Sequence, residues 1–142
     1  MSSDGGLRPL FQKHLPEFYW QPVESWSTGR GVPDVNFCFA GTEGWIENKV
    51  AATNKVEMRP EQVAWHERRI RAGGRTFIAV RFKHSGGPRK GDPVDRLYLY
   101  PGIEARSLLT KGISHSLDLG QWNGGPARWD WVSIKKLLTV RT

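Results

Sequence analysis

The sequence has very little cysteine and no long apolar segment. Its one cysteine, Cys38, excludes an internal disulfide and fits a reducing compartment. No apolar run approaches the roughly 20 residues that a membrane-spanning helix needs. The first residues also lack the basic and apolar parts of a signal peptide. We therefore expect a cytoplasmic protein that does not work in a membrane.

Internal repeats, low-complexity tracts and Cys/His clusters are also missing, so nothing in the sequence suggests a repeat architecture or a zinc site. The 142 residues, of which 38% are hydrophobic and 25% charged, suit one globular domain with one core. We expect a single domain over residues 1–142, with its core at about 7–100. Residues 101–142 would then form a C-terminal extension that packs on this core or on a partner subunit.

Acidic residues are scarce relative to basic ones. Lys and Arg number 21 against 14 Asp and Glu, which gives a formal net charge of +7. Such an excess favours a polyanionic partner, and nucleic acid is the commonest one. Charge alone leaves open a basic surface that has no such partner.

The most informative stretch is residues 31–49. An apolar run, a glycine-rich turn and a second short strand follow one another there, which predicts a β-hairpin with its turn over residues 41–44. Side chains alternate along a strand, so Glu47 and Lys49 share one face. Asp34 stands at the start of the partner strand, where the hairpin brings its carboxylate beside them.

Two carboxylates and an ammonium on one wall have a simple chemical use. Hard carboxylate oxygens hold Mg²⁺ or Mn²⁺, and the metal acidifies a bound water and neutralises charge on a phosphate. The lysine orients or deprotonates that water, or stabilises the charge that builds up on phosphorus. The competing interpretation is a satisfied buried ion pair between Glu47 and Lys49. A third charged group, Asp34, arriving from the next strand favours the metal.

The remaining pattern predicts an α/β fold. A strand, a helix and a strand follow one another from residue 45 to residue 82, which implies a parallel pair inside a mixed sheet flanked by helices. Further helices are expected at 7–15, 103–111 and after Asp130, and further strands at 18–23 and 97–100.

Three motifs in order carry a family resemblance. Residues 31–34 are Gly-Val-Pro-Asp, residues 45–49 are Trp-Ile-Glu-Asn-Lys, and a helix opens with Pro-Glu-Gln at 60–62. This set resembles the PD-(D/E)XK nuclease superfamily, in particular the virus-type replication-repair nucleases (VRR-NUC) and the archaeal-type Holliday junction resolvases. The resemblance covers residues 25–82.

The resemblance implies a restriction-endonuclease-like fold and a Mg²⁺-dependent (or Mn²⁺-dependent) DNA endonuclease. By this resemblance Asp34 and Glu47 hold the metal, Lys49 activates or holds the attacking water, and Gln62 orients it. The implied substrate is a four-way DNA junction, cut by a homodimer because two symmetric strands must be cleaved. Small nucleases of this type are common in phages, and the compartment would be the host cytoplasm if the protein is phage-encoded. The alternatives are a sequence-reading nicking or restriction-like endonuclease and a non-catalytic nucleic-acid-binding module.

Basic and polar residues near this motif are candidate DNA contacts, although a solvated loop explains most of them equally well. The candidates lie in the polar loop before Asp34, around the helix that opens at Pro60, and in a turn-rich loop at 83–96. They are Ser27, Arg30, Lys55, Arg59, Arg69, Arg89 and Lys90.

Several further residues have open roles. Glu17 and Glu24 are candidates for an accessory acid at the metal, although a solvated carboxylate is favoured for Glu17. His66 shares a polar helix stripe with Gln62 and Arg69, and we expect it at the surface. Late tryptophans suit base stacking, a dimer interface or the core, and the core is favoured for the last of them. These are Trp122, Trp129 and Trp131.

Overall fold

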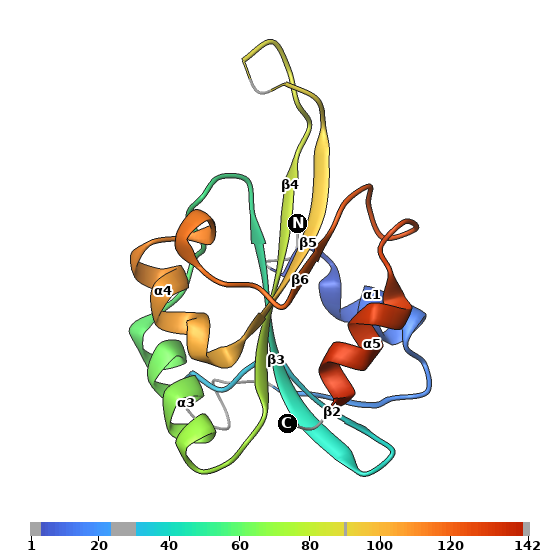
Figure 1. Cartoon of the computed structure of the whole chain (residues 1–142), viewed down its shortest axis with the longest axis vertical. Coiled ribbons are helices and arrows are strands. Elements are labelled where there is room, and N and C mark those ends of the chain that lie inside the picture. Colours follow the sequence, from blue (N-terminus) through green and yellow to red (C-terminus); the bar gives the residue numbers. More distant parts are fainter. Residues whose placement is uncertain (1–3, 24–30, 90, 141–142) are drawn as a thin grey trace.

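A six-stranded mixed sheet runs through the centre of the protein (Figure 1). The computed structural model describes residues 4–23, 31–89 and 91–140. The strands lie side by side in chain order, and only β3 and β4 are parallel, so the predicted α/β class is confirmed. The strands are β1 (Tyr19–Pro22), β2 (Val35–Phe39), β3 (Thr42–Ala51), β4 (Thr76–His84), β5 (Val94–Pro101) and β6 (Gly120–Trp122).

Helices cover both faces of the sheet. Figure 1 shows α1 (Leu7–His14) and α5 (Trp131–Thr139) on one side, and α3 (Pro60–Arg71) and α4 (Ala105–Thr110) on the other. Two short 3₁₀ turns flank α4, at Gly102–Glu104 and Ile113–His115. No helix in the described part of the chain is both long and apolar enough to cross a membrane.

Alternation along the central strands produces two apolar layers. Val35, Phe37 and Ile46 point to the α1/α5 side and are almost completely buried there. The opposite side packs Val63 of α3 and Leu108 of α4 against β4 and β5. The C-terminal residues belong to the first layer, since α5 buries two residues there and Trp129 is 3% exposed. The segment after residue 100 is therefore part of the core.

The turn of the predicted hairpin lies earlier than expected. Phe39 pairs with Thr42, so the two turn residues are Ala40 and Gly41, both with positive φ. This is the backbone geometry that a tight two-residue β-turn requires. Gly44 lies inside β3 instead, where an added Cβ would come within 2.5 Å of the Phe37 ring. The turn predicted over 41–44 is thus wrong, because Gly44 serves packing and not a turn.

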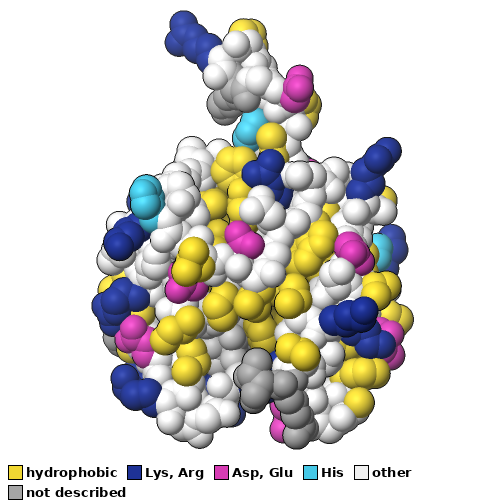
Figure 2. All heavy atoms as spheres, viewed as in Figure 1, with side chains coloured by type: hydrophobic (Ala, Val, Ile, Leu, Met, Phe, Trp, Pro, Cys, Tyr) yellow, Lys and Arg dark blue, Asp and Glu magenta, His cyan; other side chains and the backbone are white. Residues whose placement is uncertain are grey.

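Two other predictions need correction. The β4–β5 ladder continues to the His84–Val94 pair, which reduces the loop predicted at 83–96 to residues 85–93. The resulting hairpin projects from the body of the protein (Figures 1 and 2). Strand β6 was not predicted, because its three residues include a glycine and a glutamine and show no strand pattern.

His66 is completely buried, so its predicted surface position is wrong. The stripe on α3 divides: Gln62 and His66 face the sheet, while Arg69 is exposed. His66 Nδ1 lies 2.9 Å from the Thr76 hydroxyl. Burial lowers the pKa of His66 to about 4, and the positive charge of Lys49 acts in the same direction.

This burial predicts a pH-dependent loss of stability. Between its ordinary pKa of 6.5 and about 4, His66 takes up a proton in the unfolded chain but not in the folded one. The free energy of unfolding should therefore fall by roughly 3 kcal/mol as the pH drops through this window. Urea unfolding at several pH values measures it. In His66→Gln the free energy of unfolding should depend less steeply on pH than in the wild type. An identical pH dependence in the two proteins would contradict the assignment of this loss to His66.

Candidate active site

A pocket of about 540 Å³ opens on the α3 side of the sheet, beside the carboxyl half of β3. Asp34 reaches it from just before β2, Glu47 and Lys49 from β3, and Gln62 from the first turn of α3. All four predicted catalytic residues therefore line one cavity. The remaining lining residues are Asn48, Val50, Glu57, Met58 and Arg59.

The register of the β2–β3 hairpin fixes the position of Asp34. Val35 pairs with Ile46, so Asp34 lies beside the middle of β3. Its Oδ2 accepts a hydrogen bond of 2.8 Å from the backbone N–H of Asn48. The Asp34 carbonyl in turn accepts one of 2.8 Å from the amide of Val23. The carboxylate is thus held at the pocket by main-chain contacts, beside the carboxyl of Glu47.

Glu47 carries the unusual electrostatics of the site. The residue is 2% exposed, and among the described residues no group donates a hydrogen bond to its buried Oε1. Burial raises the pKa of this carboxyl well above its ordinary value, and the nearby charge of Asp34 raises it further. The positive charge of Lys49 opposes these effects without cancelling them. A cation placed between the two carboxylates would remove this penalty.

Lys49 is held mainly by Gln62 and only loosely by Glu47. Its Nζ donates to Gln62 Oε1 at 3.0 Å, whereas Glu47 Oε2 lies 3.8 Å away. The backbone N–H of Arg59 donates to the same Gln62 oxygen at 2.9 Å. Gln62 therefore ties the lysine to the start of α3. A satisfied buried ion pair would have shorter contacts and no unpaired carboxylate oxygen.

Gly31 explains how the segment before Asp34 meets α3. Its φ is +80°, and a Cβ there would overlap the carbonyl oxygen of Glu61. The chain thus packs directly on the first helical turn, one residue from Gln62. The first and last residues of the 31–34 motif therefore act together: glycine permits the approach, and the aspartate lies at the pocket.

The donor set fits a divalent cation. Within the described ranges no group of three or more His, Cys, Asp or Glu residues is placed to hold a metal. Mg²⁺, however, is usually bound through one or two carboxylates, with waters and substrate phosphates completing its octahedron. Asp34 and Glu47 provide that pair, and the unpaired buried oxygen of Glu47 is the kind of acceptor a cation satisfies.

The candidate accessory acids do not join the pair in the described structure. Glu17 is exposed and forms an ion pair with Lys135 at 3.2 Å. This agrees with the solvated position that the sequence favours for it. Glu24 lies outside the described residues. Sequence reasoning missed Glu57, an exposed carboxylate on the pocket wall that is 3.6 Å from Lys55. Its loop showed no periodic pattern that could have placed it.

The predicted DNA contacts are spread over the molecule. Arg59 lines the pocket and Lys55 is exposed nearby, while Arg69 lies towards the other end of α3 and Arg89 on the projecting hairpin. Figure 2 shows basic side chains on both flanks of the face in view. The other three candidates lie outside the described residues: Ser27, Arg30 and Lys90.

The late tryptophans serve the core. Trp129 is 3% exposed, and Trp131 packs edge-on against Phe11 with ring centroids 5.5 Å apart. Trp122 is partly buried against the same layer. The core interpretation favoured for Trp131 is thus confirmed.

No family model matches the chain, and no curated protein is significantly similar to it.

Gly31 offers a test of the packing that positions Gln62. Gly31→Ala should lower the free energy of unfolding by about 1–3 kcal/mol more than Gly73→Ala, because its Cβ overlaps backbone. Gly73 is the matched control, since it also has positive φ but no atom lies within 4 Å of an added Cβ. Gly73→Ala should lower the free energy of unfolding only by the conformational penalty of about 1–2 kcal/mol. Equal losses in chemical denaturation would show that Gly31 does not support α3.

Proposed function

We propose that the protein is a metal-dependent DNA endonuclease that hydrolyses phosphodiester bonds. The observation that carries the proposal is the buried Glu47 carboxylate, which has an unpaired oxygen and lies beside a second carboxylate in an open pocket. Such an arrangement costs stability unless a cation binds. The positive net charge supports a nucleic-acid substrate, and the order of the three motifs supports hydrolytic chemistry.

Each residue of the site has a defined task. Asp34 and Glu47 would hold Mg²⁺ or Mn²⁺. When bound, the cation acidifies water and neutralises charge on the phosphate. The Lys49 ammonium orients the attacking water and stabilises the charge that develops on the phosphate oxygens. Gln62 keeps Lys49 in place through its Oε1, while its amide nitrogen remains as a donor towards water or phosphate.

The substrate class follows from the family resemblance. We propose branched DNA, with a four-way junction as the preferred form. Cutting both symmetric strands of such a junction requires two active sites, so we expect a C2 homodimer. We expect the enzyme to work in the cytoplasm, or in the host cytoplasm if it is encoded by a phage.

A substitution of Lys49 distinguishes a catalytic role from a structural one. We expect Lys49→Ala to retain DNA binding within about threefold while cleavage falls at least 100-fold, the scale of losing one charge-stabilising group at a reacting centre. The exposed Lys111, whose side chain forms no ion pair within the described structure, provides the matched control Lys111→Ala. Far-UV circular dichroism would establish that both variants fold. Equal loss of fold and cleavage in Lys49→Ala would mean a structural role.

Cleavage of a labelled four-way junction beside a linear duplex of the same sequence tests the function itself. With Mg²⁺ we expect paired symmetric cuts in the junction, and none with EDTA or in Glu47→Gln. Cuts in both substrates would support nuclease activity and contradict the preference for junctions. A fixed cut site in plain duplex would indicate a sequence-reading enzyme, and metal-independent binding without cleavage a binding module.

A further inference from the structure

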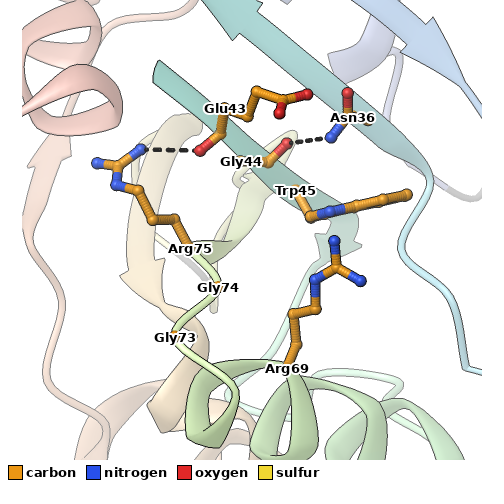
Figure 3. Close-up of a pocket in the computed structure, with 8 residues that line it drawn as sticks. All are labelled: Asn36, Glu43, Gly44, Trp45, Arg69, Gly73, Gly74 and Arg75. Atoms are coloured by element: carbon orange, nitrogen blue, oxygen red, sulfur yellow. Dashed lines mark hydrogen bonds between the residues drawn. The ribbon is translucent and has the colours of Figure 1, made fainter. Parts of the chain in front are cut away.

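A second pocket of about 260 Å³ lies on the same side of the sheet, nearer the start of β3 (Figure 3). Trp45 and Arg69 form one wall, and the Gly73–Gly74 turn and Arg75 form the other (Figure 3). Asn36 and Glu43 contribute polar side chains at its edge. We propose that this pocket binds an unpaired nucleotide of the DNA strand next to the cleaved phosphate.

Position is the first argument, and it rests on the proposed function. Trp45 precedes Glu47 by two residues, so both side chains face the same side of β3 and lie roughly 7 Å apart along the strand. Successive nucleotides in a stacked DNA strand are about 3.4 Å apart, and an unstacked strand extends further. A nucleotide adjoining the phosphate at Glu47 therefore reaches Trp45.

The chemistry of the wall is the second argument. The Arg69 guanidinium lies over the Trp45 ring at 5.3 Å and over the Trp65 ring at 5.4 Å from their centroids. Arg69 is exposed, and no described carboxylate lies within ion-pair distance of it. A half-buried indole with an uncompensated arginine along it is the combination that single-stranded DNA sites use, with a base stacked on the ring–guanidinium pair and a phosphate near the cation.

The other groups of the pocket favour a base over a bare phosphate. Glu43 is exposed at the edge, and its negative charge would repel a phosphate there but can accept hydrogen bonds from base amino groups. Asn36 donates to the Gly44 carbonyl at 3.1 Å and keeps its own oxygen as an acceptor. Arg75 is occupied, because it donates to the carbonyls of Leu138 and Val140.

The glycine turn gives Arg69 its place. A Cβ on Gly74 would come within 2.7 Å of Arg69 Cγ, so a side chain at this position would displace the arginine. The backbone N–H of Gly74 also donates to the Arg69 carbonyl at 2.9 Å. The end of α3 is therefore built around an arginine that lies along Trp45.

The test measures stacking without cleavage. A splayed-arm DNA carries 2-aminopurine, a fluorescent adenine analogue, at the first unpaired position of one arm or the other. It is titrated with Glu47→Gln protein in EDTA. We expect the fluorescence to fall on binding for at least one label. Adding Trp45→Ala should abolish the fall and weaken binding roughly tenfold, whereas Trp45→Phe, which retains a ring, should keep part of both.

Arg69 has a matched control in its neighbour Arg68, which is also exposed on α3. Arg69→Ala should weaken binding several-fold and reduce the salt dependence of log K by about one. Arg68→Ala should change affinity less than twofold. Quenching that persists in a folded Trp45→Ala protein, equal losses for Arg68→Ala and Arg69→Ala, or no binding at all would overturn the proposal.

The two proposals fail separately in this design. If the wild-type protein cuts junctions but the 2-aminopurine fluorescence still falls in Trp45→Ala, the nucleotide pocket is wrong and the nuclease proposal stands. Protein that never cuts but loses both quenching and affinity with Trp45→Ala would remove the nuclease and keep the pocket as a DNA-binding site.

Discussion

The buried carboxylate of Glu47 is the constraint on which the rest of the site depends. It lies in the interface between β3 and α3, close to Asp34, and the Lys49 ammonium is 3.8 Å away. An isolated buried charge is strongly unfavourable, so the fold must supply compensation. Gln62 positions the lysine, Gly31 lets the chain approach α3, and the β2–β3 register brings Asp34 alongside. A divalent cation between the two carboxylates, as we propose, would complete this compensation.

Much of this arrangement could be predicted from local patterns. The alternation in β2 and β3 placed Asp34, Glu47 and Lys49 on one face, and Pro60 followed by Gln62 marked the helix whose first turn meets them. The glycine pair at 73–74 set the end of that helix. Such features depend on periodicity and turn chemistry over a few residues, which a sequence displays directly.

The features that could not be predicted depend on contacts between distant segments. His66 looks like a surface histidine on a polar stripe, but Thr76 and the segment at Gly102 enclose it. Gly44 looks like a turn residue, but Phe37 occupies the space above it. Strand β6 exists because β5 offers it an edge to pair with. The pocket between Trp45 and Arg69 joins a strand to the far end of a helix, and neither segment alone indicates it.

The central proposal is that Asp34 and Glu47 together bind a divalent cation. Electron paramagnetic resonance of free Mn²⁺, titrated into the protein without DNA, measures this directly. We expect the wild-type chain to take up Mn²⁺ in competition with Mg²⁺. The affinity should fall at least tenfold in both Asp34→Asn and Glu47→Gln, as expected when a ligand oxygen loses its charge. Equal Mn²⁺ uptake by the wild type and both variants, or no uptake by any of them, would contradict the account.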